Sequence, residues 1–307
     1  MSKIAFTFPG QGAHACGMGQ DFYEQTETGK RIFDKATELM GFSMPQLCFE
    51  ENDRLDITEY TQAAMVTASI AMMRVLEENG IKPDVAAGLS LGEYCALAAA
   101  GVMSDEDAIR TVRQRGILMQ EAVPVGEGAM AAILALDASA IEEVTGAMEG
   151  VWIANYNCPG QIVISGEKAA VEDACEKLKA AGAKRAVMLN VSGPFHSGML
   201  ADAGERLGEV LSQVELHEPQ IPYVANVTAQ YVKSAAEVKE LLTRQVSSSV
   251  RWQQSVEAMI ADGVDTFIEI GPGKTLAGFM RKISRDVKTL NVEKLEDISK
   301  VAEALKS

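Results

Sequence analysis

The fold is decided by the segment Val85-Ala86-Ala87-Gly88-Leu89-Ser90-Leu91-Gly92-Glu93-Tyr94-Cys95-Ala96-Leu97-Ala98. A short apolar run, typical of a buried strand, leads through a Gly-x-Ser-x-Gly pentapeptide into a run of helix-forming residues. Gly88 and Gly92 let the backbone turn sharply without a Cβ clash. A serine at such a turn stands at the start of the helix, where free N–H groups and the helix dipole favour a developing oxyanion. The segment therefore predicts a nucleophile elbow with Ser90 as the nucleophile.

On both sides of this segment, short apolar runs alternate with amphipathic stretches, which is typical of α/β proteins. We expect strands at 4–8, 85–89, 222–225 and 266–270, and helices at 62–78, 105–120, 199–214 and 252–261. The Ala-rich stretch 95–102 is expected to be a core helix. Alternation of this kind favours a mostly parallel sheet.

A smaller unit is predicted between residues 123 and 193. Its expected order is strand (129–136), helix (138–148), strand (151–156), strand (161–165), helix (168–181) and strand (184–189). That is the ferredoxin-like order β-α-β-β-α-β. Pro124 and Gly126 punctuate its entrance and Gly193-Pro194 its exit. We therefore expect a discontinuous large catalytic α/β domain, 1–122 and 194–307, with a ferredoxin-like subdomain inserted at 123–193.

Composition narrows the possible functions. The chain has 307 residues and a formal net charge of -15, which argues against a nucleic-acid partner. Its five cysteines show no C-x-x-C spacing and it has three histidines, so no metal site is expected. The first apolar run is too brief for a signal peptide, and no later run reaches membrane-spanning length. We expect a cytoplasmic monomer that does not bind membranes.

The nucleophile needs a base, and the three histidines are the candidates. His196 is preferred because it stands in the turn-rich stretch Ser192-Gly193-Pro194-Phe195-His196-Ser197, which leads into a helix. His217 precedes Glu218-Pro219 and is interpreted as a surface residue. His14 lies in a glycine loop that offers nothing to orient it.

That loop follows the first strand and reads Pro9-Gly10-Gln11-Gly12-Ala13-His14-Ala15-Cys16-Gly17-Met18-Gly19. It is a poor dinucleotide fingerprint, because Ala15 stands where a third glycine would be and the chain has no P-loop Lys-Ser/Thr pair. We expect no tightly bound cofactor. The loop is interpreted as a source of backbone N–H groups beside a reacting carbonyl, with a plain structural turn as the alternative.

Five motifs occur in order along the chain: Pro9-Gly10-Gln11-Gly12, Gly88-Leu89-Ser90-Leu91-Gly92-Glu93-Tyr94, Arg113-Gln114-Arg115-Gly116, Gly193-Pro194-Phe195-His196-Ser197 and Glu269-Ile270-Gly271-Pro272-Gly273. With these motifs the chain resembles the malonyl-CoA:acyl carrier protein transacylase family over nearly its whole length. One departure is Leu89, because family members often have histidine before the nucleophile.

The resemblance implies ping-pong transfer in fatty acid chain elongation. A malonyl group would move from coenzyme A to Ser90, with His196 as the base, and then to the phosphopantetheine thiol of acyl carrier protein. The resemblance also implies an oxyanion hole from the backbone N–H groups of Gln11 and Leu91. It further implies that a main-chain carbonyl, matching Gln245 here, orients the histidine.

Two further residues bear on the choice of acyl group. A guanidinium suits a carboxylate because it can donate two parallel hydrogen bonds, and on the resemblance Arg115 is the clamp for the malonyl carboxylate. Taken alone, Arg115 is as well explained as a solvated helix residue near Arg110 and Arg113. In related acyltransferases an aromatic residue before the histidine goes with unbranched malonyl, and Phe195 holds that position.

Three other functions stay open at this stage. A serine hydrolase shares the elbow, although its HGGG-like oxyanion loop is absent and an insert between Ser90 and His196 is not expected in it. A noncatalytic acyl-binding or scaffold protein and a trans-acting acyltransferase of a polyketide pathway are the others. Because carrier proteins are usually acidic, we also expect a local basic docking patch, formed by Lys184, Arg185, Arg281, Lys282 and Arg285.

Overall fold

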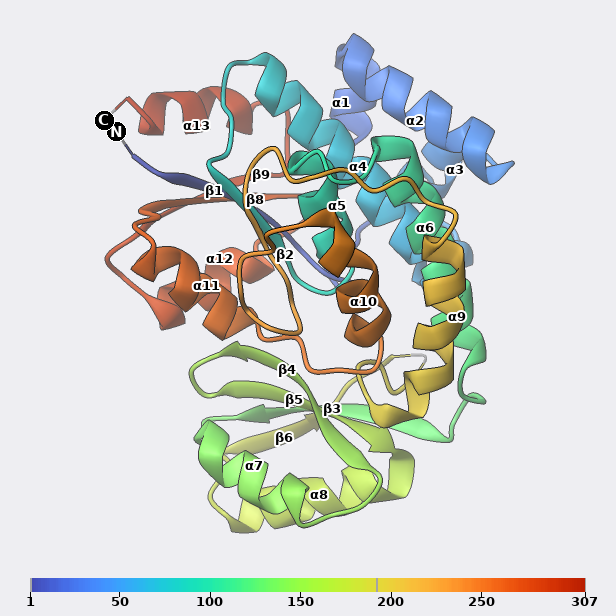
Figure 1. Cartoon of the computed structure of the whole chain (residues 1–307), viewed down its shortest axis with the longest axis vertical. Coiled ribbons are helices and arrows are strands. Elements are labelled where there is room, and N and C mark those ends of the chain that lie inside the picture. The colour runs from blue at the N-terminus through green and yellow to red at the C-terminus, as the bar shows by residue number, and fades with distance from the viewer. Residues whose placement is uncertain (1, 192, 307) are drawn as a thin grey trace.

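The computed structural model describes residues 2–191 and 193–306, and within them the strands form two separate sheets (Figure 1). The first sheet has the order β7-β2-β1-β8-β9, and every neighbouring pair in it is parallel. Its strands are β1 (Ile4–Phe8), β2 (Val85–Gly88), β7 (Tyr223–Val224), β8 (Thr266–Ile270) and β9 (Lys288–Val292).

Helices cover both faces of this sheet, and two apolar clusters fill the space between (Figure 1). Because β1, β2 and β8 are buried on both faces, their sequences are mostly apolar, and the polar residues Thr7, Thr266 and Glu269 within them are buried as well. The helices around this sheet are α1 (Gln20–Gln25), α2 (Glu27–Met40), α3 (Met44–Phe49), α4 (Thr58–Glu78), α5 (Gly92–Ala99), α6 (Asp105–Glu121), α9 (Ala201–Leu211), α10 (Ala235–Gln245), α11 (Trp252–Ala261), α12 (Thr275–Ile283) and α13 (Asp297–Ala304), with short 3-10 turns η1 (Asp53–Asp56) and η2 (Gly198–Leu200).

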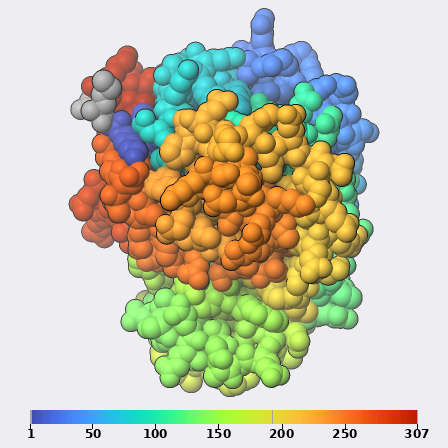
Figure 2. Space-filling view, in the orientation of Figure 1, coloured from blue at the N-terminus to red at the C-terminus, as the bar shows by residue number. Residues whose placement is uncertain are grey.

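The second sheet is antiparallel and has the order β4-β5-β3-β6. Its elements are β3 (Gly128–Leu134), α7 (Ala138–Gly146), β4 (Val151–Cys158), β5 (Gln161–Glu167), α8 (Lys168–Ala180) and β6 (Arg185–Met188). Both helices pack on one face of the sheet over a third apolar cluster. This region, residues 128–188, is called the small lobe and lies below the parallel sheet in Figures 1 and 2.

The small lobe is tied to the rest of the protein through its edge strand β4. Val250 donates its backbone N–H to Ala154 O at 2.8 Å and accepts from Tyr156 N at 2.9 Å. Ser249 Oγ donates to Ile153 O at 2.5 Å. The segment that precedes α11 therefore runs along β4 as an additional short strand contact.

The α/β fold class, with a parallel sheet and a separate ferredoxin-like sheet, is confirmed. Each predicted strand and helix is present, most of them with ends shifted by one to four residues. Strand β9 was not predicted, because Lys288–Val292 is a partly exposed edge strand with little apolar signal. Among the described residues, no helix is both long and apolar enough to span a bilayer. Residues 2–191 and 193–306 likewise contain no cluster of metal-binding side chains.

Candidate active site

The elbow forms as a tight turn between β2 and α5, and Ser90 stands at its tip with φ 55°. A Cβ on Gly88 would lie 2.0 Å from the Gly92 carbonyl, and a Cβ on Gly92 would lie 2.3 Å from Phe8 O. Neither position therefore accepts a side chain. A non-glycine residue at positive φ costs about 1–3 kcal/mol, so the surrounding structure has to hold Ser90 in place.

Ser90 and His196 form a hydrogen-bonded pair across 106 residues of sequence. Ser90 Oγ lies 2.7 Å from His196 Nε2, and His196 Nδ1 lies 2.8 Å from the carbonyl oxygen of Gln245. Because a carbonyl only accepts, Nδ1 carries the proton and Nε2 is free to accept from the serine hydroxyl. The histidine is thus oriented by a main-chain carbonyl at the end of α10.

The environment of His196 keeps its ring neutral. The residue is 4% exposed and has φ 59°. Burial and the nearby Arg115 charge lower the pKa of His196 to about 4, against hydrogen bonds to backbone oxygens that raise it. A neutral imidazole is the form that accepts a proton from serine, so the ring is available as a base throughout the neutral range.

Arg115, on α6, is 1% exposed and lies beside the nucleophile. Its Nη1 donates to Gln62 Oε1 at 2.7 Å, and its Nη2 donates to both Ser90 Oγ and Gln245 Oε1 at 3.0 Å. Burial lowers the pKa of the guanidinium from its ordinary value. Among the described residues, no carboxylate forms an ion pair with Arg115, and its buried Nε has no hydrogen-bond partner. The site therefore holds a fixed cation that is suited to a substrate carboxylate.

Two backbone N–H groups lie in the turns around Ser90. Leu91 is the first residue after the nucleophile and caps the N-terminus of α5. Gln11 follows β1, and its side chain is anchored because Nε2 donates to Thr58 Oγ1 at 3.1 Å. Within the described part of the chain, no hydrogen bond engages the backbone N–H of either residue. Both are thus free to donate to a substrate oxygen.

The remaining predicted residues lie as follows. Phe195 is 7% exposed and packs in the main apolar cluster immediately before His196. His14 contacts Asp56 through Nε2 at 3.0 Å, and the His217 side chain is 56% exposed. Of the three histidines, His196 is the one whose ring contacts the nucleophile.

Three polar side chains at the site were not given a role from the sequence: Gln62, Glu93 and Asn226. Asn226 comes two residues after β7, the neighbour of β2 in the parallel sheet. A polar residue directly after a strand at the carboxyl edge of such a sheet is the signal that could have indicated it. Gln62 could have been indicated by a similar signal, because it is an amide among the mostly apolar residues of α4 and is fully buried there.

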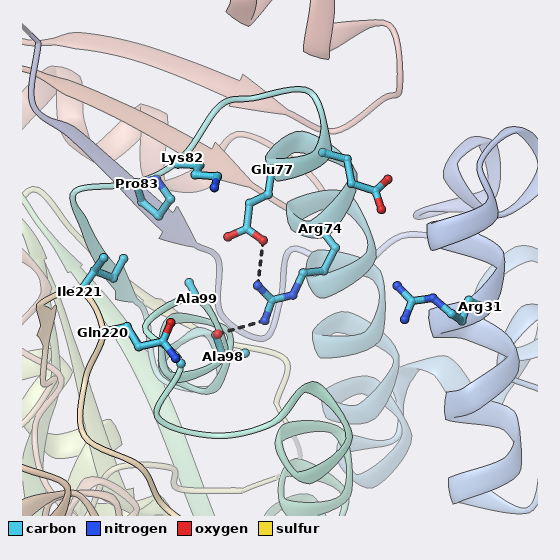
Figure 3. A pocket seen from close by; sticks show the side chains of 11 residues that line it. Arg31, Arg74, Glu77, Lys82, Pro83, Ala98, Ala99, Gln220 and Ile221 are labelled. Carbon is cyan, nitrogen blue, oxygen red and sulfur yellow. Dashed lines mark hydrogen bonds and ion pairs between the residues drawn. The ribbon is translucent and has the colours of Figure 1, made fainter.

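A separate cavity of about 580 Å³ opens at the other end of α5 (Figure 3). Its walls come from α2, α4, the end of α5 and the loop before β7. Arg74 lies in it and is already neutralised by Glu77 and Asp105. None of the candidate site residues lines this cavity, which is therefore distinct from the active site.

The fold and the site together define a class of protein: α/β proteins in which a serine on a strand-to-helix turn is hydrogen-bonded to a buried histidine held by a main-chain carbonyl, with a buried arginine beside the serine. Comparison with known families gives the same result, because residues 5–300 match the family model described as "Acyl transferase domain". The chain belongs to this acyl transferase family.

Curated relatives and solved structures cover nearly the whole chain. A malonyl CoA-acyl carrier protein transacylase of Bacillus subtilis is 50% identical, covering 100% of this chain and 98% of its own. The crystal structure of an acyl carrier protein S-malonyltransferase from Vibrio cholerae superposes with a TM-score of 0.95 at 42% identity, covering 98% and 100%. A structure described as "type II PKS acyl-carrier protein in complex with its malonyl-transacylase" gives 0.95 at 40% identity, covering 99% and 100%.

Proposed function

We propose that this protein transfers a malonyl group from coenzyme A to the phosphopantetheine thiol of acyl carrier protein, through a malonyl ester on Ser90, and so supplies fatty acid chain elongation. The observation that carries the proposal is the buried Arg115, whose guanidinium lies 3.0 Å from Ser90 Oγ. A cation fixed at that distance from the nucleophile selects an acyl group that ends in a carboxylate. The names of the relatives support the same acyl group and the same acceptor.

In the first half-reaction, Ser90 Oγ attacks the thioester carbonyl while His196 Nε2 takes the hydroxyl proton. The backbone N–H groups of Gln11 and Leu91 stabilise the oxyanion, and Arg115 holds the free carboxylate. As the C–S bond breaks, His196 returns the proton to the sulfur and coenzyme A leaves as the thiol. The malonyl group is then an ester on Ser90.

The second half-reaction reverses these steps with a different thiol. His196 takes the proton of the phosphopantetheine thiol, the sulfur attacks the ester carbonyl, and the proton returns to Ser90 Oγ as the C–O bond breaks. Both substrates use the same site in turn, so the kinetics are ping-pong. The chain needs no tightly bound cofactor for this sequence, because the phosphopantetheine arrives on the partner.

The division into domains is part of the proposal. Residues 1–122 and 194–307 form the large catalytic domain, and 123–193 form the inserted subdomain. The small lobe has its own apolar cluster. We expect the ester at Ser90 to be shielded from water where the two parts meet. We assign the protein to the cytoplasm as a monomer.

A type II polyketide carrier is the second candidate acceptor. The similarity to the transacylase in complex with such a carrier favours it, at 40% identity and a TM-score of 0.95. The chemistry at Ser90 is the same for both carriers. The two candidates therefore differ only in the surface that docks the carrier.

The test is to load the purified protein with malonyl-CoA and then add a holo carrier protein from fatty acid or polyketide synthesis. We expect the malonyl group to appear on the carrier thiol, and the faster carrier identifies the pathway. Loss of the ester to water at the same rate with and without carrier would show a hydrolase instead.

A further inference from the structure

Buried side chains hold both backbone groups of the nucleophile. Ser90 donates its N–H to Asn226 Oδ1 at 2.6 Å, and Asn226 Nδ2 donates to Gly88 O at 2.6 Å. One amide side chain therefore spans the elbow from residue 88 to residue 90. On the other side, Gln245 Nε2 donates to the carbonyl oxygen of Ser90 at 2.9 Å.

The carboxylate of Glu93 joins these two amides. Its Oε2 accepts from the backbone N–H of Asn226 at 3.2 Å and from Gln245 Nε2 at 2.8 Å. Glu93 and Asn226 are each 1% exposed, and Gln245 is 0% exposed. Because buried polar groups of this kind are costly unless they are paired, the network has one well-defined arrangement.

This arrangement has two consequences for Ser90. The first is that a non-glycine residue at φ 55° is kept there by hydrogen bonds to its own N–H and C=O. The second is that the Ser90 N–H is already occupied, which leaves the N–H groups of Gln11 and Leu91 as the donors for a substrate oxyanion. Neither Asn226 nor Glu93 contacts the Ser90 hydroxyl, so both act through the backbone.

We propose that Asn226 and Glu93 are positioning residues for this acyl transfer. Asn226 holds the elbow that aims Ser90 Oγ at the substrate carbonyl. Glu93 fixes the positions of Asn226 and Gln245 relative to each other. The inference rests on the proposed function only for the identity of the acyl group. The placement of the serine is independent of which acyl group arrives.

The experiment measures how fast Ser90 reacts with a fluorophosphonate, followed by intact mass. The serine oxygen forms the P–O bond, fluoride leaves, and His196 takes the serine proton. We expect Asn226→Ala and Glu93→Ala each to slow labelling on the order of 100-fold, the scale of a misplaced reacting atom. Glu93→Gln should stay within about tenfold of wild type, because one amide oxygen can still accept both hydrogen bonds. The KM for malonyl-CoA should stay unchanged while kcat falls.

The double variant Asn226→Ala/Glu93→Ala tests whether the two residues act as a unit. We expect it to label no more than about threefold slower than either single variant, since residues in one network are not additive. The matched control is Glu269→Gln, another 1% exposed carboxylate that accepts two backbone N–H groups but lies outside this network. It should lower the melting temperature without changing the labelling rate.

Two results would overturn the inference: wild-type labelling by folded Asn226→Ala protein with only a lower melting temperature, or fully additive effects in the double variant. The proposed function is tested separately. If the wild-type protein did not accept malonyl-CoA but its labelling still depended on Asn226 and Glu93, malonyl transfer would be refuted and this inference would stand.

Discussion

At the scale of single residues, the chemistry depends on His196 staying neutral in a buried site. Its hydrogen bond to the Gln245 carbonyl fixes which nitrogen faces Ser90, and burial keeps the second proton off. A carboxylate in place of that carbonyl would favour the charged ring. The main-chain carbonyl orients the base without placing a full negative charge beside the ring.

This arrangement predicts the pH dependence of acylation. The folded-state pKa of His196 is lowered from 6.5 to about 4, so the active neutral form persists as the pH falls below 6.5. We expect kcat/KM for malonyl-CoA to decline only with a midpoint near pH 4. Stability should respond earlier: the contribution of His196 should fall as the pH drops from 6.5 to 4, because over that range the unfolded chain binds the proton that the folded protein excludes, and it should stay constant below pH 4. Stopped-flow acylation in wild type measures the rate, and a midpoint near 6.5 would contradict the account.

Arg115 predicts selectivity between acyl groups. Leaving a substrate carboxylate unpaired in a dry site costs on the order of 2 to 5 kcal/mol, which is roughly 30-fold to several-thousand-fold in rate. Arg115→Ala should therefore lower malonyl loading by such a factor while sparing or improving acetyl loading.

The matched control for this prediction is Arg113→Ala, on the same helix. Arg113 pairs with Glu59 and stacks on Tyr60 instead of contacting Ser90. Its removal should leave the malonyl-to-acetyl ratio unchanged. An equal loss of both activities in Arg115→Ala would point to structural damage rather than to a carboxylate clamp.

At the scale of elements, the elbow between β2 and α5 is the most tightly constrained turn of the site. Gly88→Ala would place a Cβ 2.0 Å from the Gly92 backbone, which cannot move without breaking the turn. We expect the free energy of unfolding to fall by about 1–3 kcal/mol or more, which is the usual cost of overpacking. Urea denaturation measures it.

Gly278→Ala is the matched control, because Gly278 lies within α12 and a Cβ there would meet nothing within 4 Å. That variant should be more stable by about 0.5–1 kcal/mol, since alanine is the better helix former. If Gly88→Ala were as stable as wild type, the inference that the elbow has no room for a Cβ at residue 88 would be wrong.

The elements also show what the sequence could predict. β1, β8 and α11 were predicted with their observed ends, because buried strands and amphipathic helices carry strong local patterns. The elbow motif indicates Ser90 and the turn-rich stretch before a helix favours His196, whereas Arg115 was assigned only on the family resemblance, because its own context fits a solvated arginine equally well. The Asn226 contact was not predictable, because it joins residues 136 apart in sequence and depends on the strand order.

At the scale of the whole molecule, basic residues lie both in the small lobe and at the end of α12, and these two parts contact each other. In the small lobe, Gln161, Leu134 and Arg185 stand in one row across β5, β3 and β6. Lys282 Nζ, from α12, donates to Gln161 Oε1 at 3.4 Å at the end of that row. Lys184, Arg185, Arg281, Lys282 and Arg285 are all exposed, and this set is called the basic rim.

This rim predicts how the carrier docks. In a chain of net charge -15, a local basic rim is where an acidic carrier would be attracted. Reversing Lys184, Arg185 and Lys282 to glutamate should lower transfer to the carrier about tenfold or more and weaken its salt dependence. Ser90 loading from malonyl-CoA is the internal control and should not change. Unaltered transfer and salt dependence would exclude the rim as the docking surface.

Every step of the proposed transfer passes through a covalent malonyl ester on Ser90. The most direct measurement is to mix the protein with malonyl-CoA, quench with acid, and locate the adduct by intact mass and peptide mapping. We expect one malonyl group on the peptide that contains Ser90 and none in Ser90→Ala. An adduct of the same yield in Ser90→Ala, or one mapped to another residue, would contradict it.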